Sequence, residues 1–89
     1  MKAVITVVGK GRTGIIAAVS GYLAEKSINI LDISQTIMQD LFTMIMLVDT
    51  NTSDIKAGAL SDDLNVLAEE IGVKINVQHE GLFSSMHRI

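Results

Sequence analysis

Cysteine is absent from this 89-residue chain, and aromatic residues are scarce: one tyrosine, two phenylalanines and no tryptophan. The lack of cysteine excludes disulfides, thiolate nucleophiles and cysteine-ligated zinc or iron–sulfur sites, and it is typical of a cytoplasmic protein, which we expect here. Three aromatic rings are too few for a platform that stacks on single-stranded nucleic acid. The seven basic residues are scattered and the net charge is −3, whereas a nucleic-acid surface clusters its cations. We therefore expect no nucleic-acid partner.

No apolar run approaches the roughly 20 residues of a membrane span, and the N-terminal MKAVITVVGK is followed by no signal-peptide cleavage site. We therefore expect no membrane partner. A hydrophobic content of 48% is typical of one compact globular domain. We assign residues 1–89 to that domain, with a core of residues 1–79 and a helical tail of residues 80–89.

Hydrophobic periodicity predicts the secondary structure of the core. Two runs, AVITVV and LFTMIMLV, are apolar at odd and even positions alike, which is typical of central strands covered on both faces. We expect Thr13 to be the N-cap of the first helix and Gly72 the C-cap of the second. The predicted order is strand 3–8, a helix that ends near residue 27, strand 28–39, strand 41–48, helix 60–71 and strand 73–79.

The middle of the chain determines the topology. Strands 28–39 and 41–48 are joined so closely that they must form an antiparallel hairpin. The apolar residues change parity between Ile30 and Leu31, which predicts a bulge or a strand that begins near Leu31, and Asp32, Ser34 and Thr36 indicate an edge strand. Two right-handed βαβ units then give an α+β, ferredoxin-like βαββαβ sandwich, in which a four-stranded antiparallel sheet carries two helices on one face, followed by a short C-terminal helix.

This fold leaves one face of the sheet without helices. Within the first strand, Val4 and Val8 fall on one face and Ile5 and Val7 on the other, so both faces are apolar. A contiguous exposed apolar patch usually marks an interface. We therefore expect a homodimer or a higher homo-oligomer in preference to a solvated apolar face.

Gly9, Gly11 and Gly14 in VVGKGRTGII spell G-x-G-x-x-G between a strand and a helix, and Asp32 stands where a dinucleotide fold has its ribose-binding acid. A dinucleotide fold, however, needs a helical crossover after its second strand, where this chain has a hairpin. We therefore predict no nucleotide cofactor. Two interpretations of the glycines stay open: a turn with positive φ that presents backbone N–H groups to a carboxylate or other small anion, and a tight turn that lets helix and sheet pack closely.

The strand that ends at Gly9, the Arg-Thr-Gly-Ile that opens the helix at Arg12, and the Asn-Ile at Asn29 together resemble the ACT regulatory domain, which binds amino acids. The resemblance covers essentially the whole chain and is close to the small stand-alone ACT proteins of prokaryotes. Gly11 departs from the family pattern, which commonly has Asp there. An acidic contact to a ligand amino group or to Arg12 is therefore missing.

The resemblance implies a ligand site between subunits, where the loop after the first strand of one copy faces the second strand of the other. This likeness implies no cofactor besides the small-molecule ligand. Carried over residue by residue, it implicates Gly9, Lys10, Gly11, Arg12, Thr13, Gly14, Asn29, Ile30, Leu31 and Asp32.

Plainer roles stay open for two of these residues. Arg12 either clamps a ligand carboxylate or is a surface arginine, solvated or paired with Asp32. Asn29 binds the ligand or satisfies a backbone group at the start of its strand. His79 and His87 match no metal-ligand spacing with their acidic neighbour Glu80, so we expect no metal site.

No serine or threonine lies in a nucleophile-like context, and both histidines lie far along the chain from the glycine segment. We therefore expect no enzymatic activity. The sequence predicts an ACT-type regulatory domain that binds an amino acid or a related metabolite at a homodimer interface and signals to a protein partner. The alternative is a ligand-free dimerisation or protein-interaction module whose open sheet face docks another protein.

Overall fold

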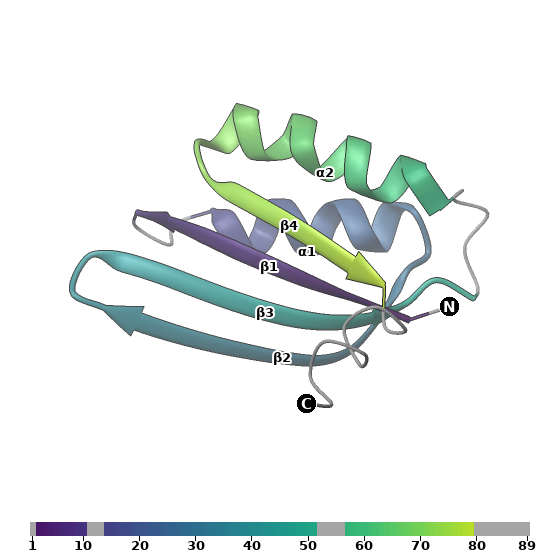
Figure 1. The fold of residues 1–89 in the computed structure, drawn as a ribbon, viewed down its shortest axis with the longest axis horizontal. Coiled ribbons are helices and arrows are strands. Elements are labelled where there is room, and N and C mark those ends of the chain that lie inside the picture. Colours follow the sequence, from purple (N-terminus) through teal and green to yellow (C-terminus); the bar gives the residue numbers. More distant parts are fainter. Residues whose placement is uncertain (1, 11–13, 52–56, 80–89) are drawn as a thin grey trace.

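The computed structural model describes residues 2–10, 14–51 and 57–79. Within these ranges the elements follow the predicted order, with bounds close to the predicted ones (Figure 1). The helix predicted over residues 80–89 lies outside the described residues. The elements are β1 (Lys2–Lys10), α1 (Ile15–Glu25), β2 (Asn29–Met38), β3 (Leu41–Asp49), α2 (Ala57–Ile71) and β4 (Lys74–His79).

The strands form one antiparallel sheet in the order β2-β3-β1-β4, which confirms the ferredoxin-like sandwich. β1 pairs with β3 over its whole length and with β4 from Ala3 to Val8, so the two doubly apolar strands lie in the middle. β2 and β3 form an antiparallel hairpin, and β2 is one edge strand of the sheet (Figure 1). Because β1 has antiparallel neighbours on both sides, the parallel sheet of a dinucleotide fold is excluded.

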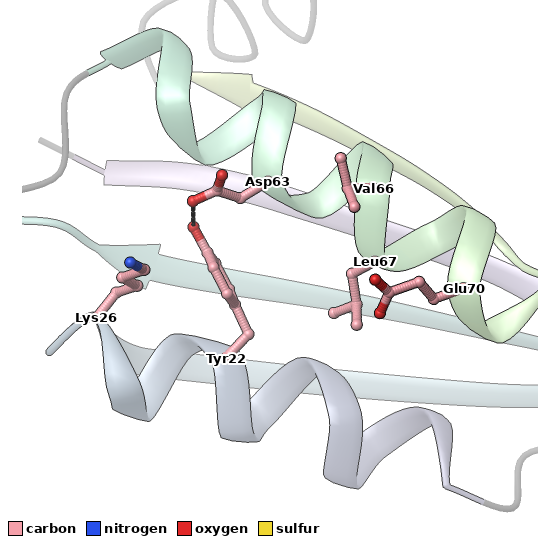
Figure 2. A pocket seen from close by; sticks show the side chains of 6 residues that line it. All are labelled: Tyr22, Lys26, Asp63, Val66, Leu67 and Glu70. Carbon is pink, nitrogen blue, oxygen red and sulfur yellow. Dashed lines mark hydrogen bonds between the residues drawn. The ribbon is translucent and has the colours of Figure 1, made fainter.

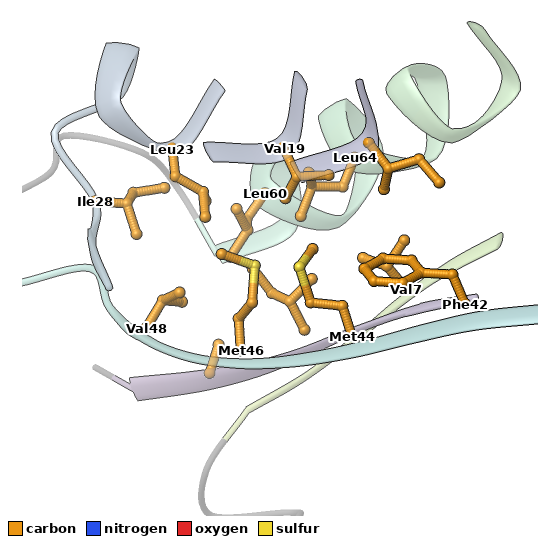
Figure 3. Close-up of a cluster of buried hydrophobic side chains, with 13 residues drawn as sticks. Val7, Val19, Leu23, Ile28, Phe42, Met44, Met46, Val48, Leu60 and Leu64 are labelled. Atoms are coloured by element: carbon orange, nitrogen blue, oxygen red, sulfur yellow. The ribbon is translucent and has the colours of Figure 1, made fainter. Parts of the chain in front are cut away.

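The hydrophobic core lies between the sheet and the two helices (Figure 3). Alternate side chains of β1 and β3 point into it and are met by the apolar stripes of α1 and α2. No polar or charged side chain among the described residues is buried. The largest fully buried side chains are Phe42, Ile5, Leu23, Met44, Met46, Leu60, Leu64, Val7, Val19 and Val48.

Both helices end in the same way. Gly72 follows α2 with φ +73°, and the Val73 N–H donates to the Ala68 carbonyl at 3.0 Å. This is the Schellman arrangement, and it confirms Gly72 as the predicted cap. At the end of α1, Ser27 takes the left-handed position with φ +59°, and the Ile28 N–H donates five residues back at 2.9 Å. These compact ends return the chain directly into β2 and β4.

The start of α1 differs from the prediction. The N-cap is Gly14, with φ +82°, and no side chain caps the helix. Thr13 was predicted for this position, which was wrong, and Thr13 lies outside the described residues. The physical reason is conformational, because the chain enters the helix through a left-handed residue, which glycine adopts without strain.

The hairpin between β2 and β3 provides a test of backbone strain. Gln39 has φ +58° in a two-residue loop between the paired residues Met38 and Leu41. A positive φ at the first loop position alone is the type II′ pattern, which prefers glycine there. We expect Gln39→Gly to raise the free energy of unfolding by about 0.5–1 kcal/mol, measured from urea unfolding curves.

The matched control is Asp40→Gly, at the second loop position, where φ is not positive. This variant gains no relief of strain and adds freedom to the unfolded chain, so its unfolding midpoint falls. A Gln39→Gly midpoint at or below that of the unmodified protein would contradict the assignment of strain to Gln39.

Candidate functional site

The glycine segment of the predicted site joins β1 to α1. Gly9 and Lys10 are the last two residues of β1, and Gly14 precedes α1 (Figure 1). Gly11, Arg12 and Thr13 lie outside the described residues. The described part of this segment therefore consists of the end of a central strand and the start of a helix, at one end of the sheet.

The two described motif glycines have different roles. Gly14 has a positive φ of +82°, as predicted for an open backbone turn. Gly9 does not, because it is a buried strand residue paired with Phe42. A Cβ on Gly9 would lie 2.5 Å from Cγ1 of Val73 and 3.1 Å from its Cβ. Of the two interpretations that the sequence left open, the turn with positive φ is wrong for Gly9, and close packing explains this glycine.

The second group of predicted site residues, 29–32, forms the start of β2. The ladder with β3 skips Leu31, between Ile30 and Asp32, which confirms the predicted bulge. The Asp32 carboxylate accepts a hydrogen bond from the Ile33 N–H at 2.8 Å, directly after the bulge. All four side chains of this group are exposed. The bulge thus turns an exposed, partly polar strand start toward solvent at the sheet edge.

Within one chain these two groups lie at opposite ends of the sheet. Lys10 pairs with Leu41 at the hairpin end, whereas Asn29 pairs with Asp49, which pairs in turn with Lys2 at the other end (Figure 1). The strand β1 lies between them, and at about 3.3 Å per residue it spans roughly 26 Å. A single copy therefore does not bring the glycine segment and residues 29–32 together.

The strand β2 is exposed along its whole length. Its side chains on the helix side, Ile30, Ile33 and Ile37, are 36%, 39% and 49% exposed, because the helices cover the other three strands and leave this edge open (Figure 1). On the opposite face, Ile45 of the neighbouring strand is also exposed. We call the exposed side chains of β2 the β2 surface. The backbone edge of β2 is also open, because β2 is an edge strand of the sheet.

The helix-free face of the sheet is less open than predicted. Val4 is buried, and Val8 and Leu47 are half-buried, whereas Ile45, Leu41 and its paired residue Met38 are exposed on this face. Side chains of the adjacent strands flank the central ones, since Val8 lies opposite Lys74 in the ladder. All the exposed large hydrophobic residues of the described chain except Val66 therefore lie on β2 and the neighbouring β3.

A pocket of about 480 Å³ lies beside the glycine segment. It is lined by residues 8–10, Leu41 and residues 72–74, so only Gly9 and Lys10 belong to the predicted site. The sequence analysis missed Lys74 as a neighbour of Lys10. The predicted antiparallel pairing of the first and last strands contained the signal, because it places the end of β1 beside the start of β4.

A second pocket, of about 320 Å³, lies between α1 and α2 (Figure 2). The Tyr22 hydroxyl donates a 2.7 Å hydrogen bond to the Asp63 carboxylate, which ties the two helices together. Burial raises the pKa of Tyr22, and the hydrogen bond to Asp63 raises it further, so this hydroxyl stays protonated. The arrangement is structural, because a permanently protonated phenol that is engaged by a carboxylate is not available as a base.

Within the described ranges there is neither a metal-binding cluster nor a helix fit to cross a membrane. No group of three or more His, Cys, Asp or Glu residues in residues 2–10, 14–51 and 57–79 is placed to hold a metal ion. Neither α1 nor α2 combines the length and the hydropathy of a membrane-spanning helix.

Comparison with known proteins agrees with the geometry. The profile of the ACT domain family matches residues 2–78. A UPF0237 protein of Clostridium acetobutylicum is 54% identical over 89 residues, which are 100% of both chains. An ACT domain protein from Streptococcus pneumoniae is 42% identical and covers 93% of each chain with a TM-score of 0.84. The ligand-free regulatory subunit of aspartate kinase from Thermus thermophilus is 25% identical, with a TM-score of 0.68 over 86% of this chain and 50% of that one.

Proposed function

The chain belongs to the ACT domain family, and from this premise we propose that it is a non-enzymatic regulatory domain that binds an amino acid or a related small metabolite between two copies of itself. ACT domains are usually regulatory domains that bind small molecules. The likeness to a regulatory subunit of aspartate kinase supports such a role. Ligand occupancy would then be passed to a protein partner through the dimer.

The exposure of β2 carries the proposal of a dimer. An edge strand that is exposed on both faces and carries Ile33 and Ile37 is a poor solvent-facing surface and a good partner for a second strand. Two copies related by a two-fold axis pair their β2 strands antiparallel and join their sheets into one. This contact pairs the open backbone edge of β2 and shields part of the β2 surface.

The same axis brings the two halves of the site together. In an antiparallel pair, the start of one β2 lies beside the end of the other, so residues 29–32 of a second copy approach the hairpin end and its glycine segment. Backbone N–H groups at the start of α1, after Gly14, suit a ligand carboxylate. Asp32 is the one acidic residue among the proposed site residues, and it receives the ligand's amino group in place of an acid at Gly11.

The dimer is tested by light scattering coupled to gel filtration at micromolar concentration. We expect a mass of twice 9.6 kDa for the unmodified protein. Ile33→Lys places a charge on the β2 surface and should give the monomer. Val66→Lys is the control, because Val66 is an exposed apolar residue on α2, 58% exposed and away from β2. A monomer at every concentration for the unmodified protein would remove the inter-subunit site.

The ligand is tested by thermal unfolding in the presence of each of the twenty amino acids. A ligand at 100 times its Kd adds about 2.7 kcal/mol to the free energy of unfolding. Asp32→Asn should remove the stabilisation by that amino acid and leave the dimer mass unchanged. A stable dimer that no amino acid stabilises at millimolar concentration would instead favour the ligand-free dimerisation module.

A further inference from the structure

The pocket beside the glycine segment lies at one end of the sheet, where the end of β1 meets the start of β4. Lys10 is the last residue of β1, and Lys74 is the first residue of β4 (Figure 1). Both side chains line the pocket, together with the apolar residues Val8 and Leu41. Every described lining residue belongs to one chain, so the pocket needs no second copy to form.

Backbone pairing and close packing fix the two lysines relative to each other. Val8 lies opposite Lys74 in the ladder between β1 and β4. Lys10 is two residues further along β1, so the two lysines are diagonal neighbours on the same face, roughly 7–8 Å apart and somewhat less between their Cβ atoms. Val73 packs against Gly9 with no room for a Cβ, which holds the start of β4 against the end of β1. The backbone positions of the two lysines are thus fixed before any ligand binds.

The charges around this pocket are unusual for an acidic protein with a net charge of −3. Four lysines and no arginine fall within the described residues. Lys2 lies opposite Asp49 in the ladder of β1 and β3, and Lys26 shares its pocket with two carboxylates of α2. Lys10 and Lys74 instead share a pocket for which the described lining includes no acidic residue. Two like charges held side by side without a carboxylate favour an anion between them.

We propose that this pocket binds a small dianionic metabolite, whose two negative charges lie on one phosphoryl group or on two carboxylates, between the ammonium groups of Lys10 and Lys74. Lysine ammonium groups bind such oxygens as point charges with up to three donors each. Val8 and Leu41 contact the short apolar part of the ligand. This site goes beyond the proposed function, because it lies toward β4, is complete in one chain and does not use residues 29–32.

The test is a titration of the full chain with inorganic phosphate and, separately, with succinate, followed by amide chemical shifts at constant ionic strength. We expect saturable shifts around Lys10 and Lys74 with at least one of the two probes. Saturation with phosphate alone identifies a phosphoryl group, saturation with succinate alone identifies a dicarboxylate, and each outcome supports the site. The absence of saturation with both probes overturns it.

Two variants distinguish specific binding of the anion in this pocket from nonspecific attraction of anions to any lysine. Lys74→Gln should raise the dissociation constant for the bound probe at least 10-fold. Lys26→Gln removes the same charge elsewhere and should change that dissociation constant less than 2-fold. Equal effects of the two substitutions would overturn the proposal.

The dimer-breaking Ile33→Lys distinguishes this site from the inter-subunit site. Retained dianion binding in that variant supports a pocket within one chain, even if no amino acid binds between subunits. Loss of dianion binding there would place the anion between subunits and overturn the proposal.

Discussion

Phe42→Ala is expected to lower the free energy of unfolding by about 3–5 kcal/mol, which is a large part of the 5–15 kcal/mol that holds a typical domain folded. Phe42 is 1% exposed and lies on β3 between Ile37 of β2 and Gly9 of β1. Gly9, the residue paired with Phe42 on β1, has no side chain, and the side chain of Val7 on the same strand lies beside the ring (Figure 3). Removal of the ring leaves a cavity in a close-packed core, which adds to the transfer free energy that the side chain loses.

The measurement is urea and thermal unfolding at one fixed protein concentration, because the stability of a dimer depends on concentration. The thermal midpoint should fall by more than about 12 °C. Phe42→Leu keeps most of the volume and should cost less than about 1.5 kcal/mol. Ile45→Ala changes the same strand on its open face, where the side chain is 47% exposed. If Phe42→Ala cost no more than Ile45→Ala, the core position of Phe42 would be contradicted.

Most of the fold could be predicted because local patterns and topology rules agree. The strands AVITVV and LFTMIMLV are apolar on both faces, which places them in the centre of a sheet, and the short connection after Gln39 leaves only a hairpin. The parity change at Leu31 predicted either a bulge or a strand that begins there, and the ladder shows the bulge. Each of these features depends on residues that are close together in the sequence, and hydrophobic periodicity predicts such local structure well.

The rest depended on distances between segments that are far apart in sequence. Gly9 and Gly14 look alike in the motif, yet Gly9 is required by the approach of Val73 and Gly14 by its own positive φ. The exposure of β2 depends on how far the two helices reach across the sheet, which no local pattern encodes. The closeness of Lys10 to Lys74, as diagonal neighbours, likewise arises from the register of β1 and β4.

Gly9→Ala is expected to lower the free energy of unfolding by about 1–3 kcal/mol, because the added Cβ would lie 2.5 Å from Cγ1 of Val73. Val73 is β-branched and packs against the core, so it cannot turn aside at little cost. The matched control is Gly21→Ala. Gly21 lies inside α1, where an added Cβ would meet nothing within 4 Å, so alanine should raise stability there by about 0.5–1 kcal/mol.

A double-mutant cycle shows whether the clash with Val73 is the cause. Val73→Ala removes both Cγ atoms, so the combination with Gly9→Ala should be less destabilising than the sum of the two single changes by at least about 0.5 kcal/mol. Additive costs would contradict the packing explanation. If Gly9 were present only to let a ligand approach the backbone, Gly9→Ala would leave unfolding unchanged and weaken ligand binding alone. The unfolding measurement on the ligand-free protein therefore separates the two roles that the motif left open.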